Sequence, residues 1–263
     1  DDAAYTGFNG GSVSINGLSQ TLNVNGSNVE VSAEPSYFDF SSSDIEVARV
    51  SELGVVTIVG DGTAEISATL AGVAASGKLT VESLGNFISA PEPTNNPNDV
   101  ISLFSDNYTN VEASLISNFG EFQNSTLSQF EVDDDNVLNY QNVNFFGIEF
   151  NGNVELPTIN GSEMTTLHMD IYSPDQLNSG ASLNLSLRNV GPNGIVETNP
   201  FTGPPTGDDT EISTAPSLVS GQWIRVDFDI TALTDRSALG QIVFVAPVEG
   251  PSNFYVDNIY FYK

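Results

Sequence analysis

The chain has 263 residues and is strongly acidic, with six lysines and arginines against 34 aspartates and glutamates and a formal net charge of -28. A surface of this charge repels nucleic acids and anionic membranes, attracts divalent cations and suits a saline or extracellular setting. Because the sequence contains no cysteine and one histidine, disulfides, thiolate metal sites and multi-histidine metal centres are excluded. No apolar run in the sequence approaches the roughly 18 residues that would span a bilayer as a helix.

The opening stretch DDAAYTGFNGG, residues 1–11, is typical of a flexible leader. Its acidic pair resembles the export signal that follows the lipidated cysteine in surface lipoproteins of Bacteroidota. This resemblance implies an extracellular or cell-surface protein, with a lipid anchor on the outer membrane as one form of attachment. A plain boundary of a mature or trimmed chain explains the pair equally well, since neither an initiator methionine nor a signal peptide precedes it.

Residues 12–83 predict a small β-sandwich. The segments VEVSAEP, GVVTIV, AEISATL and GKLTVES are short, alternating or apolar, and bounded by glycine or proline, which is typical of strands. Residues 42–44 are expected to form side-chain turn bonds, and the glycines at 54, 60 and 62 to allow positive φ. Six side chains are expected in the core: Val47, Val50, Val55, Ile58, Ile66 and Leu70.

The stretch FSSSDIEVARVSELGVVTIVGDGTAEISATLAGV, residues 40–73, together with the strand GKLTV, resembles bacterial immunoglobulin-like group 2 domains. The shared features are a Ser-Ser-Asp turn, a Val-Ala pair, Gly-Val-Val and Gly-x-Gly-Thr-Ala. Phe40 stands where the family often has tryptophan. The resemblance implies a spacer on a cell-surface protein, with adhesion as the alternative.

The stretch SLGNFISAPEPTNNPNDV separates two series of strands. Three prolines and several asparagines cannot build a hydrogen-bonded ladder, so residues 84–97 predict a semi-rigid linker. The linker leaves residues 98–263 as a second domain of ordinary size.

The second domain also consists of strand-like segments, including VISLFS, FFGIEF, TLHMDIY, SLNLSLRNV, WIRVDFDI, QIVFVAP and the closing segment. Helical periodicity is nearly absent, and TALTDRSALG predicts one short helix or turn. We therefore expect an all-β protein, in which a small immunoglobulin-like sandwich is linked to a larger β-sandwich jelly roll.

Five segments, DVISLFSDNYTNV, LNYQNVNFFGIEF, MTTLHMDIYSPD, GQWIRVDFDI and FYVDNIYFYK, resemble β-sandwich carbohydrate-binding modules. The nearest resemblance is to modules of β-glucan-degrading hydrolases and of surface glycan-binding proteins of marine Bacteroidota. It implies non-catalytic binding of a β-glucan, with a laminarin-like β-1,3-glucan as the best single choice and an outer-membrane glycan importer as a further partner. The linkage itself is not fixed by the sequence.

The closing segment NFYVDNIYFYK changes its apolar phase in the middle. Phe254 and Val256 share one strand face, whereas Ile259 and Phe261 have the opposite parity. Either both faces are covered, or a bulge at the Asp-Asn pair shifts the phase. The resemblance implies a structural Ca²⁺ between the first and last strands, with Asp106 and Asp257 as ligands; the alternative is a turn former and a bulge residue. VDDDNV (132–137) and GDDTE (207–211) are interpreted as solvated loops, although both have cation-binding groups.

Strand parity separates core side chains from those on outer faces. A sugar-binding surface needs aromatic plates for the C–H faces of the rings and a few polar partners for the hydroxyls. The outward candidates are His168, Tyr172, Arg188 and Trp223, with Leu167, Met169, Ile171, Leu183, Leu185, Leu187, Ile224, Val226, Phe228 and Ile230 facing the core. The segment NYQNVNFFGIEF adds Tyr140, Asn144 and Phe146 as groove or rim residues.

Each candidate has a structural alternative. Trp223 can serve packing, His168 can be a satisfied structural residue, and Arg188 or Arg225 can pair with nearby aspartates. Phe119 stands where some relatives carry tryptophan, which leaves its stacking in doubt, and Phe201 is a further candidate at a loop edge.

Two other functions remain open from the sequence. A glycoside hydrolase needs only two suitably spaced carboxylates, but no Glu-x-Asp-x-x-Glu signature, nucleophile elbow or histidine-based site is present in the sequence. A protein-binding adhesin would instead use the immunoglobulin-like domain and the acidic surface.

Overall fold

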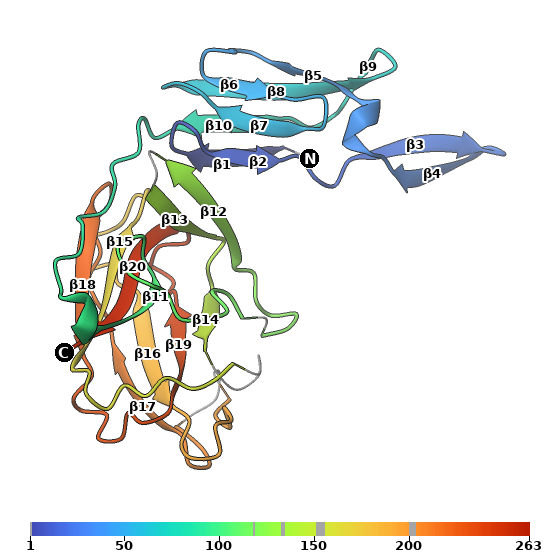
Figure 1. Ribbon diagram of the computed structural model, residues 1–263. Helices are drawn as coiled ribbons and strands as arrows, with labels where there is room; N and C mark the ends of the chain where they lie inside the picture. The colour runs from blue at the N-terminus through green and yellow to red at the C-terminus, as the bar shows by residue number, and fades with distance from the viewer. Residues whose placement is uncertain (1, 118, 133–134, 151–155, 200–203) are drawn as a thin grey trace. The chain divides into compact units, whose positions relative to one another are not determined.

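The computed structural model describes residues 2–117, 119–132, 135–150, 156–199 and 204–263. In these residues it shows strands, turns and two short 3-10 helices, so the prediction of an all-β protein is confirmed (Figure 1). The chain divides into two compact units, residues 1–88 and 89–263. Within the described ranges, no helix has the length and apolar character needed to cross a membrane.

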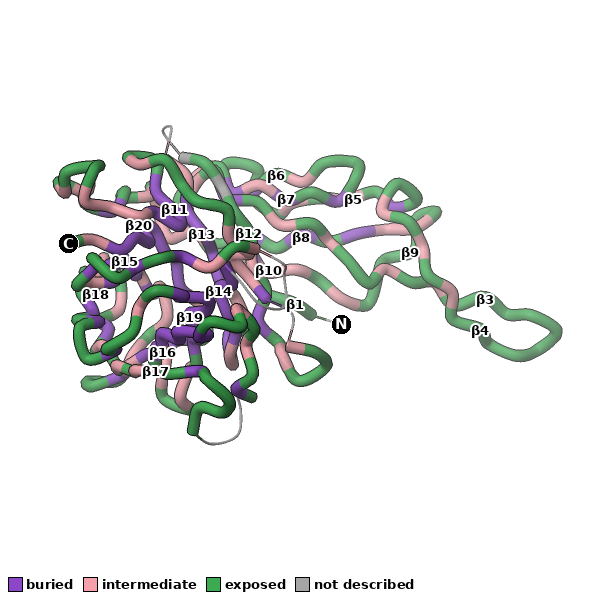
Figure 2. The backbone as a smooth tube through the Cα atoms, turned by 60° about the horizontal axis from the view of Figure 1, so that its bottom comes forward, coloured by how far each residue is buried: buried purple, intermediate pink, exposed green. Residues whose placement is uncertain are grey.

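The first unit contains a sheet with strand order β1-β10-β8-β5, to which β9 adds beside β8, a second sheet with order β2-β7-β6, and the hairpin β3-β4. Buried side chains of β6, β7, β8 and β10 meet in one core. The hairpin residues are nearly all exposed (Figure 2). The elements are β1 (Ala3–Gly7), β2 (Ser12–Ser14), β3 (Ser19–Val24), β4 (Ser27–Ser32), η1 (Pro35–Tyr37), β5 (Asp39–Ser42), β6 (Ala48–Val50), β7 (Val55–Ile58), β8 (Thr63–Leu70), β9 (Val73–Ala74) and β10 (Leu79–Ser83).

The beginning of the chain belongs to this unit. Strand β1 pairs in parallel with β10, from Ala3 opposite Leu79 to Gly7 opposite Ser83. The next residue, Phe8, is buried. The flexible leader expected over residues 1–11 therefore does not hold for the β1 residues, because their backbone completes a sheet edge and Tyr5 packs on the core.

The turn chemistry predicted for the first unit is present. Asp44 Oδ1 accepts from the Glu46 amide, and the Ser43 hydroxyl oxygen accepts from the Glu65 amide. Gly54 and Gly62 have φ of 72° and 127°, as expected, whereas Gly60 does not have the positive φ that was predicted for it. Two core predictions are wrong. Val55 is exposed and Val56 is fully buried, because Ile58, which is buried as predicted, shares a strand face with Val56 and not with Val55. Leu70 is only partly buried and lies outside the core cluster.

The second unit is a sandwich of two sheets around one hydrophobic core (Figure 1). Strands β12-β13-β20-β15-β18, with β11 beside β20, form the six-stranded sheet, and β14-β19-β16-β17 form the four-stranded sheet. The elements are η2 (Pro97–Asp99), β11 (Val100–Phe104), β12 (Thr126–Val132), β13 (Asp135–Gln141), β14 (Phe145–Glu149), β15 (Thr166–Tyr172), β16 (Asn184–Asn189), β17 (Thr210–Thr214), β18 (Trp223–Asp229), β19 (Leu239–Val245) and β20 (Phe254–Tyr262). The segment TALTDRSALG forms turns and the start of β19.

A bulge in strand β20 explains the change of apolar phase within its sequence. Asp170 pairs with Asp257 and His168 pairs with Tyr260, so two residues of β20 oppose one of β15 at a bulge. Asn258 has a φ of 56° there. The bulge returns Phe254, Val256, Ile259 and Phe261 to the same core, and both faces of the strand are buried (Figure 2). Both sequence interpretations are therefore correct together.

Part of the segment expected as a linker packs against the six-stranded sheet. Asn95 accepts hydrogen bonds from the hydroxyls of Tyr108 and Tyr260, and the carbonyl of Pro91 accepts one from Asn258 Nδ2. The backbone carbonyl of Pro91 is thus a partner of Asn258 on β20, and the side-chain oxygen of Asn95 is a partner of Tyr260 on the same strand. Residues 89–99 therefore belong to the second unit, and two of them contact the outward polar groups of β20.

Candidate functional site

An aromatic row crosses the outer face of the six-stranded sheet. Tyr172 of β15 lies opposite Trp223 of β18 on one side and opposite Tyr255 of β20 on the other. Ring centroids of Tyr172 and Trp223 are 5.7 Å apart at 55°, and those of Tyr172 and Tyr255 are 6.0 Å apart at 67°. Tyr255 is buried, whereas the other two are half-exposed. Partial burial raises the pKa of the Tyr172 hydroxyl. The outward direction predicted for Tyr172 and Trp223 is confirmed.

The neighbouring rows hold a buried polar network. His168 Nδ1 lies 2.8 Å from Asp227 Oδ1, and its Nε2 lies 3.3 Å from Asp170 Oδ2. Asp170 also accepts from Asn258 Nδ2, and Arg225 donates to Asp227. His168 is only 2% exposed. The prediction that it contacts a glycan is wrong, and the structural alternative holds, because both ring nitrogens are engaged and the imidazole packs against Tyr260 at 4.6 Å.

Arg188 lies in a polar row on the outer face of the four-stranded sheet. Glu149, Gln241, Arg188 and Glu211 are aligned in register across β14, β19, β16 and β17. The guanidinium donates to Gln241 and Glu211, and the Gln241 amide donates to Glu149. Arg188 is 2% exposed. Arg188 points away from the core as predicted. The prediction that it contacts a glycan is wrong, because its guanidinium is buried and bonded to Gln241 and Glu211. These partners are not the aspartates that the structural alternative named.

A second aromatic pair lies on the same sheet. The ring of Phe119 lies over Gly147 of β14: a Cβ at that glycine would be 2.7 Å from Phe119 Cζ. Phe119 and Phe145 have ring centroids 6.1 Å apart at 32°, and both are half-buried. The Ser117 amide donates to the Gly147 carbonyl and anchors this loop. Sequence reasoning doubted Phe119 and missed Phe145; the glycine in FFGIEF was the signal for an overlying ring.

The remaining aromatic candidates lie in the core. Tyr140 and Phe146 are fully buried and stacked, with centroids 4.1 Å apart at 15°, and the Tyr140 hydroxyl donates to the Leu115 carbonyl. Burial raises the pKa of that hydroxyl. Their prediction as groove residues is wrong, because in β14 the outward ring is the preceding residue, Phe145.

Asn144 is a positioning residue for the loop that carries Phe119. Its side-chain oxygen accepts from the Asn124 amide at 2.9 Å, and its Nδ2 donates to the Phe122 carbonyl at 2.7 Å. These bonds use both ends of the amide, so a direct glycan contact by Asn144 is not favoured. Phe201 lies outside the described residues.

The predicted metal ligands Asp106 and Asp257 come together with a third carboxylate, Asp135. Asp106 accepts from the Asn136 amide at 2.6 Å and from its Nδ2 at 3.0 Å, which places it at the start of β13. Burial, then the charge of Asp135, and further the charges of Asp170 and Asp106, raise the pKa of Asp257 to about 7. Burial and the neighbouring Asp106 also raise the pKa of Asp135. Asp135 was assigned to a solvated loop; here it begins strand β13 and is only partly exposed.

Calcium at Asp106 and Asp257 stays a prediction, because these two carboxylates and that of Asp135 are not among the described groups of three whose ligand atoms lie within 4.8 Å of one another. Asp135 Oδ2 is buried without a hydrogen-bond partner among the described atoms. Several carboxylates with an unsatisfied buried oxygen repel one another unless a cation or protons intervene, and carboxylate oxygens are the ligands that Ca²⁺ prefers. The site would link β11 and its following turn to β13 and β20.

No family model matches the sequence, and no curated protein matches it. Solved structures of β-sandwich carbohydrate-binding modules are similar in fold to the chain. A family 11 module from Clostridium thermocellum, in complex with a β-1,3-1,4-mixed-linked tetrasaccharide, has 16% identity and a TM-score of 0.36, covering 54% of this chain and 85% of that one. A family 30 module of a cellulosomal cellulase of the same organism has 15% identity and a TM-score of 0.39 over 62% and 96%. A family 29 module has 8% identity and a TM-score of 0.35 over 62% and 86%.

Because the sequence identities and TM-scores of these matches are low, a function for this protein has to be argued from its own side chains. The predicted kinship of residues 12–83 with group 2 immunoglobulin-like domains stays a prediction.

Proposed function

We propose that the protein binds a polysaccharide without cleaving it, through aromatic side chains on the outer face of its second unit. The observation that supports this most directly is the half-exposed pair of Tyr172 and Trp223, side by side on adjacent strands. A pyranose ring presents C–H groups on its faces and hydroxyls around its rim. Adjacent aromatic faces desolvate the former, and the polar edges of indole and phenol can bond the latter.

The residues next to Tyr172 and Trp223 can supply polar contacts to a sugar and hold the rings in place. Arg225, two residues along β18 on the same face, has a side chain that is 58% exposed while it donates to Asp227. A partly exposed, oriented guanidinium can donate to sugar hydroxyls with its other nitrogens. Tyr255, on the other side of Tyr172 from Trp223, is buried, and its ring packs edge-on against the Tyr172 ring. The surface is therefore rigid on one side and polar at its edge.

The aromatic pair of Phe119 and Phe145 is the alternative glycan-binding surface. Its rings lie on the opposite sheet, beside a row of carboxylates and amides that already satisfy one another. All four rings are partly buried to the same class, but phenylalanine has no polar edge to orient a hydroxyl, whereas the indole and the phenol each have one. We therefore place the main contact at Tyr172 and Trp223.

The first ligand to test is a laminarin-like β-1,3-glucan, chosen on the resemblance of the strand segments to modules of β-glucan utilisation. Calcium at Asp106, Asp135 and Asp257 is assigned a structural role, since these residues join strand ends. The first unit would serve as a spacer, on a protein at the cell surface that works beside a glycan importer.

A panel of defined oligosaccharides and polysaccharides tests the proposal. Isothermal titration of the full chain with β-1,3-, β-1,4- and mixed-linked glucans should give reversible binding to at least one of them. Incubation of the same samples, followed by assay of reducing ends, should show no turnover. Failure of every glycan to bind overturns the proposal, and sustained release of reducing ends replaces binding with hydrolysis.

A further inference from the structure

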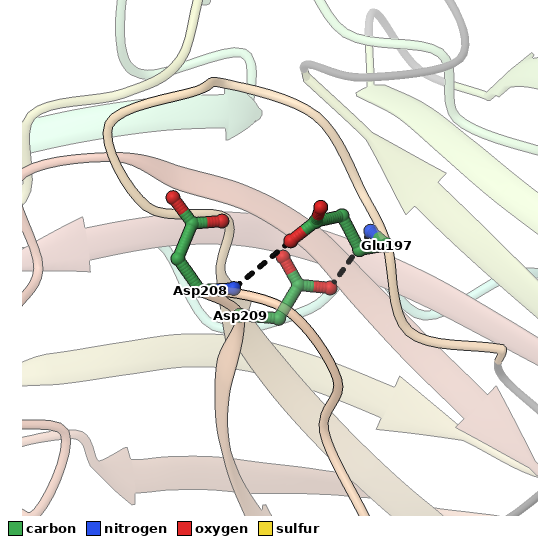
Figure 3. Close-up of side chains that lie close together, drawn as sticks. All are labelled: Glu197, Asp208 and Asp209. Carbon is green, nitrogen blue, oxygen red and sulfur yellow. Dashed lines mark hydrogen bonds between the residues drawn. The ribbon is translucent and has the colours of Figure 1, made fainter.

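A second acidic cluster lies in the connection between β16 and β17. Glu197, Asp208 and Asp209 each present a carboxylate oxygen within 4.8 Å of the others (Figure 3). They could hold a metal ion. The cluster lies next to the four-stranded sheet, whereas Asp106, Asp135 and Asp257 belong to the six-stranded sheet and its loops. The sequence interpretation of GDDTE as a solvated loop does not fit Asp209, which is only 6% exposed.

The two oxygens of Asp209 have different surroundings. Oδ2 accepts from the backbone amides of Glu197 at 3.0 Å and Thr198 at 2.8 Å. Oδ1 is buried and has no hydrogen-bond partner among the described atoms. Figure 3 shows this second oxygen directed at the carboxylate of Glu197. Two acceptor oxygens facing each other, one of them cut off from water, cost free energy unless a positive group lies between them.

Two glycines make the space for this arrangement. A Cβ on Gly207 would lie 1.5 Å from Glu197 Oε2, and a Cβ on Gly191 would lie 2.5 Å from Asp208 Cγ. Both glycines have a φ of 65°. Glu197 Oε2 is further fixed by the Asp208 amide, which donates to it at 2.9 Å. The backbone thus holds the carboxylates close together instead of letting them separate into solvent.

We propose that Glu197, Asp208 and Asp209 bind a divalent cation, and that this ion is Ca²⁺. The donors are hard carboxylate oxygens without a nitrogen or sulfur ligand, which suits Ca²⁺ better than zinc or copper. Carbonyls and waters complete its shell. The cation supplies the missing partner of Asp209 Oδ1, offsets the repulsion among three carboxylates and fixes the residues on either side of the β16–β17 connection.

The test titrates the full chain, stripped of metal with a chelator, with CaCl₂ in about 0.1 M NaCl, which screens general attraction to the acidic surface. The Asp257→Asn background removes the other proposed site. In that background we expect one calorimetric binding event. Glu197→Gln and Asp208→Asn, both at exposed side chains, should each weaken it at least tenfold. Glu52→Gln, an exposed acid in the first unit, removes the same charge and should leave the event unchanged.

Hydrogen exchange of the same samples gives a local readout. Calcium should slow amide exchange in residues 195–199 and 204–209 of the background variant and of Glu52→Gln, but not of Glu197→Gln. Calcium affinity of Glu197→Gln and Asp208→Asn equal to that of Glu52→Gln overturns the proposal, as does protection that appears elsewhere. No sugar is present, so the result is independent of glycan binding.

Discussion

Tyr172 and Trp223 lie directly opposite each other on β15 and β18, with ring centroids 5.7 Å apart and both side chains half-exposed. The two rings contact each other, and the Tyr172 ring also packs against buried Tyr255, so less side-chain ordering remains when a ligand binds. Preorganised aromatic groups are the usual origin of large losses on truncation at binding surfaces.

The first prediction concerns these two rings. Trp223→Ala and Tyr172→Ala should each weaken binding of the preferred glucan about tenfold, which corresponds to about 1.4 kcal/mol, because each removes a stacking face. Titration calorimetry measures the change, and far-UV circular dichroism confirms the fold. Tyr37→Ala is the matched control, since Tyr37 is 64% exposed in the first unit; its affinity should stay at the wild-type value. Unchanged glucan affinity in both Trp223→Ala and Tyr172→Ala would show that the glycan does not bind at these two rings.

The second prediction separates the two aromatic platforms. Gly147→Ala places a Cβ 2.7 Å from Phe119 Cζ and should displace that ring at a cost of about 1–3 kcal/mol in stability. Phe119→Ala relieves the contact, so the double variant should regain part of the lost stability relative to Gly147→Ala alone. Glucan affinity should change less in these variants than in Trp223→Ala. A larger loss for Phe119→Ala than for Trp223→Ala would transfer the site to the four-stranded sheet.

The sequence was sufficient for the directions of most side chains in the second unit. Alternation in β15, β16 and β18 separates core from outer face correctly, because regular strands preserve a period of two. It could not show which outward positions are covered. His168 and Arg188 face outward and are nevertheless buried, since long-range partners such as Tyr260 and Gln241 come from distant parts of the chain.

Irregular backbone limited the prediction elsewhere. The segment NYQNVNFFGIEF contains a turn between β13 and β14, with Asn142 at a φ of 52°. Tyr140 and Phe146, on either side of it, share a parity and both face the core, but the mixed polar and aromatic pattern around the turn does not show which face is buried. The proline-rich segment was expected to be a linker because its composition forbids a ladder. Composition does not show that Asn258, far away in the sequence, would donate a hydrogen bond to the carbonyl of Pro91.

The third prediction concerns the network around His168. His168→Phe retains an aromatic ring but removes both nitrogens from Asp227 and Asp170. Because Asp170 is buried, the loss of one of its partners should reduce the free energy of unfolding by about 2 kcal/mol. Arg225→Ala removes a partner of Asp227 at the exposed end of the network and should cost about 0–1 kcal/mol. Urea denaturation measures both, and equal losses would contradict the assignment of the network as a buried structural element.

The last prediction concerns pH and calcium at Asp257. Burial first, and then the neighbouring carboxylates, raise its pKa from 3.8 to about 7 in the metal-free fold. In the pH range between these values the folded protein holds a proton that the unfolded chain has released. The stability contributed by this group is therefore present below the lower value and is lost as the pH rises through the higher one. Calcium replaces the proton, so it should stabilise the protein more at about pH 8 than at about pH 5.

The measurement is the melting temperature in chelator and in calcium at both pH values, compared between the wild type and Asp257→Asn. Other carboxylates titrate in both proteins, so the difference between the two isolates Asp257. In chelator, the wild type should lose stability relative to the variant as the pH rises, because only the wild type acquires the buried charge. In calcium at the higher pH, the wild type should gain more than the variant, which retains only the cluster around Asp209. Parallel melting curves for the two proteins under all four conditions would show that Asp257 neither holds the shifted proton nor contributes to a calcium site.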